Sequence, residues 1–578
     1  MIRKWLPFAL AWALILMGAG LAHLIQTSGG VKVTEVRMPA GQGLTVSGLL
    51  YVPSTATAQR PAPAVLASHG YINTREMQSA FAIELARRGF VVLAMDMTGH
   101  GYSGGIVGTA DFGGPAALRY LQSLAVVDKA SIGLEGHSLG GGPILAAAAS
   151  QPDGYRSIVL EGSTPGLLPG SKTPATPRNL AIVFGQYDEF ASLMWQVPKG
   201  SDIAKSKRLM ALFGTAEPVV EGRIYGQVAD GSARVLYNPA ITHPWEHFSK
   251  GGVEPAVYWF QKTLAEPASP MLPGDQIWIW KEVGTLIAFV GLIGLLLASF
   301  DLLLGVPVFA ALNRPAEPTA ERRGGKWWLA FILTAAVPAL TYFPLMKVGQ
   351  VFFPMALFPQ WIQNQLLVWA LVNGVITLGL GFVLRGAKPV FTNRWGLSVG
   401  IALATIAVGY LSLVLVDAVF KVDYRFWVLG LKPLSATRAL IAVPYVLLWS
   451  AFFLVALRAL NANLAIRGEG LLSQVGWAKA AMALGFLVLV VVEYAVLLST
   501  GFLATPKEPL NTIVAIQFVP LLAVVGVIGA YTYRRTNSYV PGALICALLI
   551  GWYVTSGTAN HWAPGFEPQI PGASSRTR

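Results

Sequence analysis

The chain has little cysteine and little charge. Only one of its 578 residues, Cys546, is a cysteine, which excludes an intrachain disulfide and argues against a metal site built on a cysteine–histidine cluster. Charged residues make up 12% of the chain and apolar residues 54%, with a mean hydropathy of +0.55. Ordinary soluble domains carry about 25% charged residues. The composition therefore predicts that much of the chain is embedded in a membrane.

The net charge of +13 is not spread evenly. Residues 26–280 carry 19 basic and 19 acidic side chains, whereas residues 281–578 carry 21 basic and 10 acidic ones. The excess of lysine and arginine thus belongs to the apolar part, where short basic loops set the topology of membrane helices. We therefore expect a membrane as partner and no nucleic acid.

The N-terminus predicts a membrane anchor. Arg3 and Lys4 precede an apolar run from Trp5 to Leu24, which is long enough to span a bilayer as a helix with its basic end in the cytoplasm. The small residues at 20–22 also suit signal-peptide cleavage, but we favour an uncleaved anchor.

The remaining pattern divides the chain into four further parts. After the anchor at 1–25 we expect an extracytoplasmic α/β domain at 26–266, a proline-rich linker at 267–282, an all-α transmembrane domain at 283–556 and a C-terminal tail at 557–578. These parts predict an integral, multi-pass protein of the plasma or inner membrane.

The α/β domain is predicted from short β-branched runs that alternate with helical patterns, which is typical of a mostly parallel sheet. Amphipathic helices are expected at 77–88 and 114–123, and a hairpin at 223–237 around Asp230 and Gly231. The candidate strands are 64–68, 91–95, 131–135, 157–160, 180–184 and 233–237.

Eight apolar runs follow the linker, which makes about nine transmembrane helices with the anchor. They lie at 283–304, 326–346, 362–384, 396–420, 439–457, 480–500, 512–532 and 539–556. With the N-terminus inside, the basic loops at 314–326, 385–394, 458–479 and 534–535 all fall in the cytoplasm. One loop does not fit, because Lys421, Arg425, Lys432 and Arg438 are left outside.

The stretch Gly136-His137-Ser138-Leu139-Gly140 has the G-x-S-x-G spacing of a nucleophile elbow. It lies between a predicted strand and a helix rich in small residues, which is the order that this device needs. Small residues two before and two after the serine allow the tight turn that exposes its hydroxyl. Ser138 is therefore a candidate nucleophile.

Candidate partners for Ser138 follow later strands. Asp188 and Glu189 come after the strand at 180–184, and His243 and His247 come after the strand at 233–237. Acyl transfer by a serine needs a base, a group that holds the base, and N–H donors for the oxyanion. The order along the chain is therefore serine, acid, histidine.

In this order and spacing the chain resembles the α/β-hydrolase superfamily over residues 31–264. The segment His69-Gly70-Tyr71 is similar to the oxyanion-hole segment of that family, and 96–103 is similar to its D-x-x-G-x-G-x-S loop. The resemblance implies Ser138 as nucleophile, Asp188 as acid and His243 as base. It also implies an oxyanion hole formed by the backbone N–H groups of Leu139 and Tyr71.

Alternatives remain for two of these roles. Glu189, or in third place Glu161 at a strand end, could be the acid, and His247 could be the base. Asp96, His100 and His137 are expected to be structural, and His23 and His561 receive no role. The segments 162–177 and 189–242 could cover the site as a cap.

These features predict a membrane-anchored serine hydrolase that cleaves an ester, thioester or amide without cofactor or metal. A lipid or another membrane-proximal molecule is among the candidate substrates. A serine peptidase for short peptides is one alternative. A transporter or scaffold with a ligand-binding hydrolase-like domain is the other. Glu493, Asp301 and Asp417 are the acidic residues within apolar runs, and the bundle is expected to anchor, oligomerise or present lipid. The oligomeric state does not follow from the sequence.

Overall fold

Eight strands form one sheet in the N-terminal part of the chain, in the order β1-β2-β4-β3-β5-β6-β7-β8. The computed structural model describes residues 2–167, 172–173, 176–351, 357–383 and 389–563. Strands β3 to β8 run parallel, whereas β2 is antiparallel to both of its neighbours, β1 and β4. The strands are β1 Lys32–Pro39, β2 Thr45–Val52, β3 Ala62–Ser68, β4 Val91–Met95, β5 Val127–His137, β6 Ser157–Glu161, β7 Leu180–Val183 and β8 Arg234–Tyr237.

The six predicted strands all form, but two features of the sheet differ from the prediction. The sequence did not single out β1 and β2, which pair as an antiparallel hairpin at one edge. The predicted hairpin at 223–237 forms only in part, because a single antiparallel bridge joins Tyr225 to Arg234 and the first arm forms no strand. The second arm of that hairpin is β8, which pairs in parallel with β7 and so extends the main sheet.

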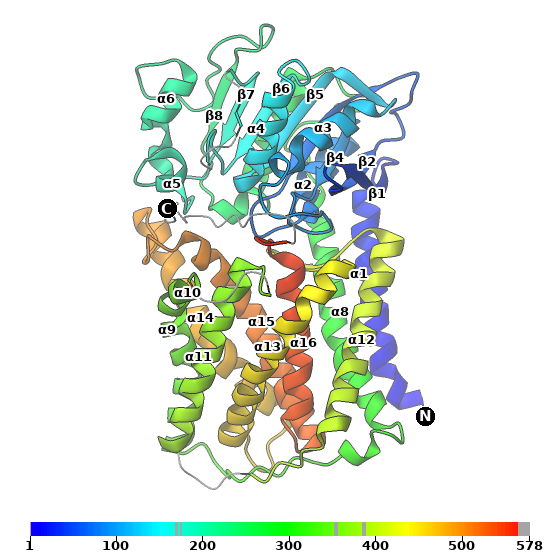
Figure 1. Cartoon of the computed structure of the whole chain (residues 1–578), viewed down its shortest axis with the longest axis vertical. Helices are drawn as coiled ribbons and strands as arrows, with labels where there is room; N and C mark the ends of the chain where they lie inside the picture. The colour runs from blue at the N-terminus through cyan, green and yellow to red at the C-terminus, as the bar shows by residue number, and fades with distance from the viewer. Residues whose placement is uncertain (1, 168–171, 174–175, 352–356, 384–388, 564–578) are drawn as a thin grey trace.

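Helices cover both faces of the sheet (Figure 1). Alternate residues of each strand point to opposite faces, so that Ala64 and Leu66 pack into one core and Val65 and Ala67 into the other. Helices α3 (Gly114–Ser123) and α4 (Gly141–Ser150) cover the first face. Helices α2 (Ser79–Arg87) and α7 (Lys250–Thr263) cover the second. Two short helices, α5 Ala191–Trp195 and α6 Lys207–Phe213, lie beyond β7.

The other layer is a bundle of long apolar helices beneath the sheet (Figure 1). Among the described residues, eight helices are long and apolar enough to cross a membrane, or nine if the bent pair α9 and α10 is one span. The chain is therefore a multi-pass membrane protein. The helices are α1 Ile2–Gln26, α8 Trp278–Leu304, α9 Gly325–Leu340, α10 Tyr342–Gly349, α11 Trp361–Val383, α12 Trp395–Phe420, α13 Ala436–Leu464, α14 Leu471–Thr500, α15 Pro509–Thr536 and α16 Val540–Gly557.

Helices α1 and α8, which flank the α/β part in sequence, pack closely on each other. A Cβ atom added to Gly18 would lie 2.5 Å from the carbonyl oxygen of Gly284. Small residues at such a crossing let the backbones approach, which is a common source of helix association in bilayers. Glu84 of α2 also accepts the N–H groups of Ile277 and Trp278 at the start of α8. The α/β part is thus attached to the bundle at both ends.

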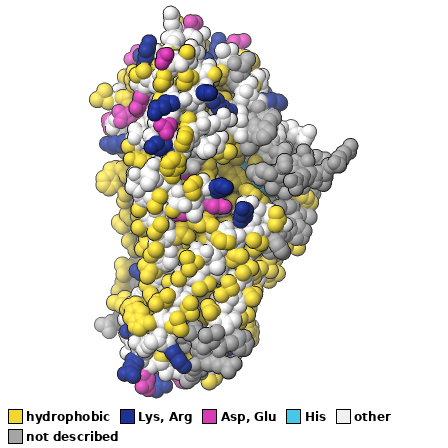
Figure 2. All heavy atoms as spheres, turned by 90° about the vertical axis from the view of Figure 1, so that its left-hand side faces the viewer, with side chains coloured by type: hydrophobic (Ala, Val, Ile, Leu, Met, Phe, Trp, Pro, Cys, Tyr) yellow, Lys and Arg dark blue, Asp and Glu magenta, His cyan; other side chains and the backbone are white. Residues whose placement is uncertain are grey.

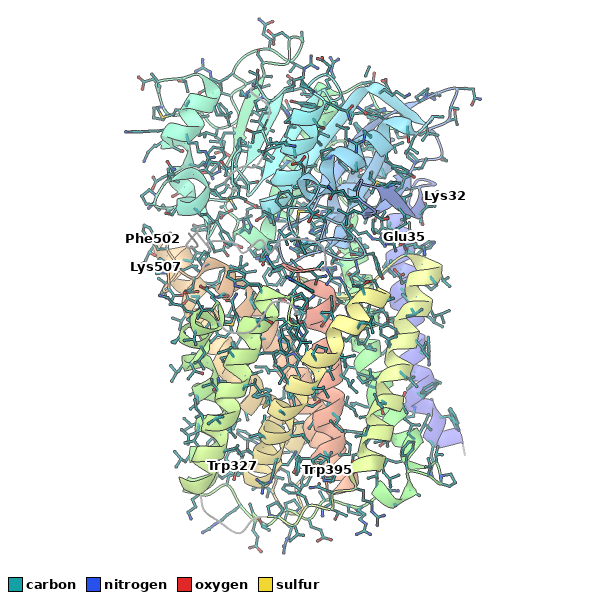
Figure 3. The ribbon with its side chains drawn as sticks, viewed as in Figure 1. Lys32, Glu35, Trp327, Trp395, Phe502 and Lys507 are labelled. Carbon is teal, nitrogen blue, oxygen red and sulfur yellow. The ribbon has the colours of Figure 1, made fainter. Side chains whose placement is uncertain are left out.

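Charged side chains gather at the two ends of the molecule and leave an apolar band between them (Figure 2). Trp327 and Trp395 lie at the end far from the sheet, whereas Lys32, Glu35, Phe502 and Lys507 lie at the level where the two layers meet (Figure 3). At the far end Arg323 pairs with Glu469, and Asp301 accepts hydrogen bonds from Tyr531 and Arg535. The described parts of the predicted cytoplasmic loops therefore share one end, while Arg385 and Lys388 lie outside the described residues.

Candidate functional site

Ser138 lies at the sharp turn between β5 and α4. Its φ is +54°, which is strained for a residue with a Cβ atom. The two elbow glycines are needed for close approach, because a Cβ on Gly136 would lie 2.5 Å from the Gly140 oxygen. A Cβ on Gly140 would lie 2.3 Å from the oxygen of Ser68. A side chain at position 136 or 140 would therefore clash within this tight turn. Ser138 lies at the tip of the turn and is partly exposed.

His243 is held by Asp188. The imidazole Nδ1 lies 2.8 Å from Asp188 Oδ2, and both side chains are buried. Asp188 Oδ1 accepts the N–H of Phe190 at 2.7 Å, which fixes the carboxylate in its loop. Burial alone would lower the pKa of His243, but the Asp188 carboxylate outweighs burial and the pKa is raised above its ordinary value of 6.5. Because Nδ1 is bound to Asp188, the other ring nitrogen, Nε2, can accept a proton on the side of the substrate.

Glu189, the alternative acid, contacts the backbone of His243 and not its ring. Its Oε2 accepts the His243 N–H at 2.8 Å, and its Oε1 accepts the hydroxyl of Tyr494 at 2.7 Å. Burial and the neighbouring Asp188 carboxylate raise the pKa of Glu189 to about 7. Glu189 therefore links the histidine loop to α14 of the bundle.

His247, the alternative base, packs against the ring of His137 with centroids 3.7 Å apart. The pKa of His247 is lowered well below its ordinary value, mainly by burial and to a smaller extent by the nearby His243. None of the carboxylates described in the structure forms a hydrogen bond to its ring. The geometry therefore favours His243 as the histidine that a carboxylate orients.

Three buried glutamates lie close behind the elbow. Glu246 accepts the N–H of Gly185 at 2.9 Å and lies 3.1 Å from His137 Nε2. Burial raises the pKa of Glu246 well above its ordinary value and lowers that of His137 well below its own. Burial also raises the pKa values of Glu135 and Glu161. Glu161, the third-ranked acid, makes no hydrogen bond to a histidine in the described structure.

One group of described side chains has the spacing of a metal site. One ligand atom each from His137, His243 and Glu246 lies within 4.8 Å of the others. All three residues already have protein partners, since His243 binds Asp188 and Glu246 binds both Gly185 and His137. The hydrogen-bond network accounts for this cluster, and we assign it to no metal.

The predicted oxyanion segment runs beside the elbow. A Cβ on Gly70 would lie 3.2 Å from the Cβ of Ser138, so the backbone of 69–71 passes directly by the serine. His100 donates to the Tyr71 carbonyl, and His69 accepts the Met97 N–H at 3.1 Å, so both histidines shape this loop. Leu139 is buried with Met97 and Phe112. The N–H groups of Tyr71 and Leu139 are thus carried by segments adjacent to Ser138.

Ser138 and His243 line one cavity, which we call the serine cavity, and the membrane bundle forms part of its wall. Its empty space, counted together with the part that is open to solvent, is about 470 Å³. No hydrogen bond joins Ser138 Oγ to His243 within the described chain. The lining residues are Gly70, Tyr71, Ile72, Asn73, Met77, His137, Ser138, Phe190, His243, Pro244, His247, Val428, Leu510, Ile513 and Gln517.

Several of these residues were not found by sequence reasoning. Val428 lies in the loop between α12 and α13, and Leu510, Ile513 and Gln517 lie on α15. His561, which received no role, binds the hydroxyl of Tyr71 through Nε2. The spacing of residues along the sequence cannot predict contacts between segments that are this far apart in the chain. Gln517, a polar residue within the apolar run at 512–532, is a signal in the sequence that could have pointed to this wall.

The basic loop that did not fit the topology docks against the α/β layer. Lys432 lies 2.9 Å from Glu76 and 4.4 Å above the ring of Tyr102. Arg438 donates to the carbonyls of Gly99 and Gly101 at 2.8 and 2.7 Å. These contacts account for the positive charges of Lys432 and Arg438. Their position outside the predicted cytoplasmic loops therefore does not contradict the predicted topology.

Glu493, the most central acid of the apolar runs, also has local partners. Thr505 donates to it through its N–H at 3.1 Å and its hydroxyl at 2.7 Å. These bonds close the turn between α14 and α15. A structural role therefore accounts for the burial of this carboxylate.

Comparison with known proteins identifies the fold. A family model described as alpha/beta hydrolase fold matches residues 63–217, which together with the sheet order shows an α/β-hydrolase domain. No curated protein matches the chain.

Three of the matching solved structures illustrate the likeness. DcsB bound to a substrate analogue shares 22% identity, covering 22% of this chain and 44% of that one, at a TM-score of 0.21. Dienelactone hydrolase from Anabaena variabilis shares 19%, covering 40% and 99%, at 0.28. An esterase from Pyrobaculum calidifontis shares 15%, covering 45% and 96%, at 0.28.

Proposed function

We propose that this chain is a membrane-anchored serine hydrolase that cleaves an ester, thioester or amide. The observation that carries the proposal is the 2.8 Å hydrogen bond from His243 to Asp188 beside a strained, partly exposed Ser138 in one cavity. A binding protein would not need an oriented histidine next to an elbow serine, whereas acyl transfer requires both.

Each residue has a defined part in the proposed reaction. Ser138 Oγ attacks the acyl carbon while its proton passes to His243 Nε2, and the carbonyl oxygen takes the negative charge. The N–H groups of Leu139 and Tyr71 stabilise that oxyanion, and Asp188 stabilises the protonated imidazole. The bond to the leaving group then breaks, and His243 gives that group its proton. Water repeats the sequence on the acyl-enzyme and releases the acid.

We also propose that the α/β-hydrolase domain lies on the extracytoplasmic side. Arg322 and Arg467 lie in loops at the opposite end of the bundle, and Arg534 and Arg535 lie there in the last turn of α15. The bridge from Ala320 to Ile466 and the hydrogen bond from the Arg314 N–H to the Arg535 carbonyl join these segments. Loops rich in arginine and lysine stay in the cytoplasm. The basic end of the bundle is therefore assigned to the cytoplasm.

A panel of acyl esters, acyl thioesters and aminoacyl amides, assayed with purified full-length protein, tests the proposed activity. We expect hydrolysis of at least one acyl ester, and its loss in Ser138→Ala. Cleavage of aminoacyl amides alone would indicate a peptidase. An ester activity that is unchanged in Ser138→Ala would contradict the mechanism.

A further inference from the structure

A second cavity lies inside the membrane bundle and adjoins the serine cavity. It lies among α11, α13, α15 and α16, and its empty space, counted together with the part that is open to solvent, is about 880 Å³. We call it the bundle cavity. Five residues line both cavities, namely Ile72, Asn73, Met77, Val428 and Gln517. The two hollows therefore meet at a shared boundary, with Ser138 on one side and the membrane helices on the other.

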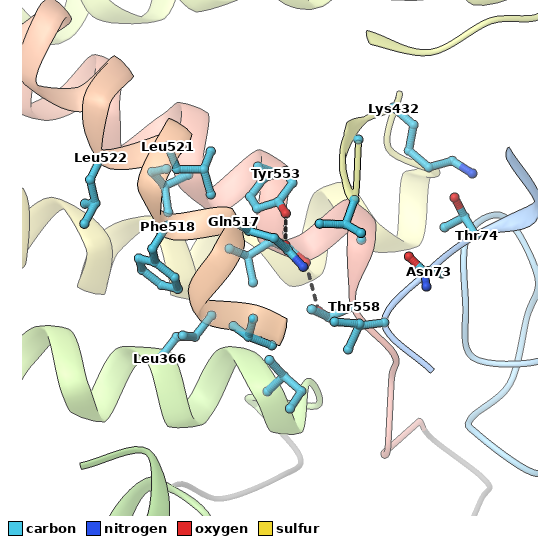
Figure 4. A pocket seen from close by; sticks show the side chains of 18 of the residues that line it. Asn73, Thr74, Leu366, Lys432, Gln517, Phe518, Leu521, Leu522, Tyr553 and Thr558 are labelled. Atoms are coloured by element: carbon cyan, nitrogen blue, oxygen red, sulfur yellow. Dashed lines mark hydrogen bonds between the residues drawn. The ribbon is translucent and has the colours of Figure 1, made fainter. Parts of the chain in front are cut away.

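The bundle cavity changes in polarity along its length. Its end towards the α/β domain carries Asn73, Thr74 and Lys432, and Gln517 lies between that end and the interior (Figure 4). Its interior is lined by large apolar side chains. Among them are Leu366, Trp369, Phe453, Phe518, Leu521 and Leu522.

The charged groups at the polar end are already paired. Lys432 binds Glu76 at 2.9 Å, and Arg425 binds Asp423. The polar end therefore offers no excess charge for an ionic ligand. The apolar interior is a poor site for water. A ligand with an uncharged polar group next to Ser138 and a hydrocarbon chain in the apolar interior would fit both ends of the cavity.

We propose that the bundle cavity binds the acyl chain of the substrate, so that the enzyme acts on long-chain acyl esters or thioesters drawn from the membrane. This inference rests on the proposed hydrolase function and adds the substrate class. The carbonyl carbon lies at Ser138, and the chain passes Met77 and Gln517 into the space between α11 and α15. The bundle is then part of the active site and not only an anchor.

Leu366 provides the test, because it lines the interior on α11 and is only 3% exposed. Esters with one leaving group and acetyl, butyryl, octanoyl or dodecanoyl chains are compared. In the wild type, kcat/KM should rise by up to about fourfold for each buried methylene until the cavity is filled. Leu366→Trp should lower the dodecanoyl-to-acetyl ratio roughly tenfold, which equals about two methylenes of burial. Leu366→Ala should raise that ratio.

A matched control lies on the same helix. Val375 is 69% exposed and lines neither cavity, so Val375→Trp should leave the chain-length profile unchanged. A thermal unfolding midpoint in detergent close to that of the wild type shows that each variant is folded. If Leu366→Trp does not fold, Ile550→Phe fills the same cavity from another helix, α16.

The outcomes separate the two proposals. A flat chain-length profile, or one that the Leu366 variants do not change while acetyl ester is hydrolysed, would overturn the acyl-chain site and leave the hydrolase intact. A wild-type protein that hydrolyses no ester, thioester or amide would overturn the proposed function itself. Acetyl esters of long alcohols form the last arm. If they alone respond to Leu366→Trp, the cavity binds the leaving group, which contradicts the acyl-chain site.

Discussion

The α/β-hydrolase domain and the bundle differ in where they bury polar groups. The domain buries imidazoles and carboxyls around Ser138, including His137, His243 and Glu246. The bundle buries amides such as Gln360 and Asn364 near its junction with the domain, and its cavity interior is lined mainly by apolar side chains. This difference supports the proposal that the domain supplies the reacting groups and that the bundle contains the binding space for an apolar substrate. Changes in the domain should then affect every substrate, and changes in the bundle should affect selectivity or docking.

The largest effect is expected from the histidine. His243→Ala should lower kcat/KM by a factor on the order of 10⁶ on every ester, because the base and the nucleophile act as a unit. His247→Ala is the matched control in the same cavity and should retain most activity. A greater loss in His247→Ala would mean that the other histidine is the base.

The next largest effect is expected from the acid. Asp188→Asn should lower kcat by about 10⁴, because the amide holds the wrong tautomer of the imidazole. Glu189→Gln should cost far less, since Glu189 contacts His243 through the backbone N–H and not through the ring. The reverse ranking of these two variants would move the acid to Glu189.

The pH profile sharpens the same comparison. The base must be neutral, so kcat/KM should rise with pH through the pKa of His243, which lies above 6.5 because Asp188 favours the charged ring. In Asp188→Asn the favourable carboxylate is gone while burial still opposes the charge, so the inflection should move to lower pH. Residual activity of Asp188→Asn can be followed from pH 5 to 9. An inflection that stays in place would show that another group titrates.

How much of this could be predicted from the sequence differs between the two regions. The elbow, the strand ends and the order of Ser138, Asp188 and His243 follow from local patterns, because each catalytic candidate comes directly after a strand. The apolar runs likewise predict the spanning helices. The wall formed by Val428, Ile513 and Gln517 could not be predicted, because it depends on how α15 and the 421–435 loop pack against a domain hundreds of residues away.

A smaller effect is expected at the junction. Lys432→Met removes one partner of a buried pair and should lower the free energy of unfolding by about 3 kcal/mol. The exposed pair of Lys205 and Asp202 is the control, and Lys205→Met should cost less than about 1 kcal/mol. Thermal unfolding of both variants in detergent measures the difference. Equal midpoints would mean that docking does not depend on this ion pair.

The orientation of the protein can be tested without any change in rate. Cys546 is fully buried, so an impermeant maleimide should label only an introduced cysteine. In intact cells Lys262→Cys, in the α/β-hydrolase domain, should be labelled, whereas Arg322→Cys should need permeabilised cells. The opposite pattern would place the domain in the cytoplasm.

The most direct test of the central claim is to find the residue that a fluorophosphonate probe modifies in the full-length protein. The probe replaces fluoride with the oxygen of an activated serine and leaves a stable phosphonyl adduct that mass spectrometry can locate. We predict one adduct, on Ser138, which is absent in Ser138→Ala and strongly reduced in His243→Ala. An adduct on another serine, or undiminished labelling of Ser138→Ala, would contradict the assignment of this elbow as the active site.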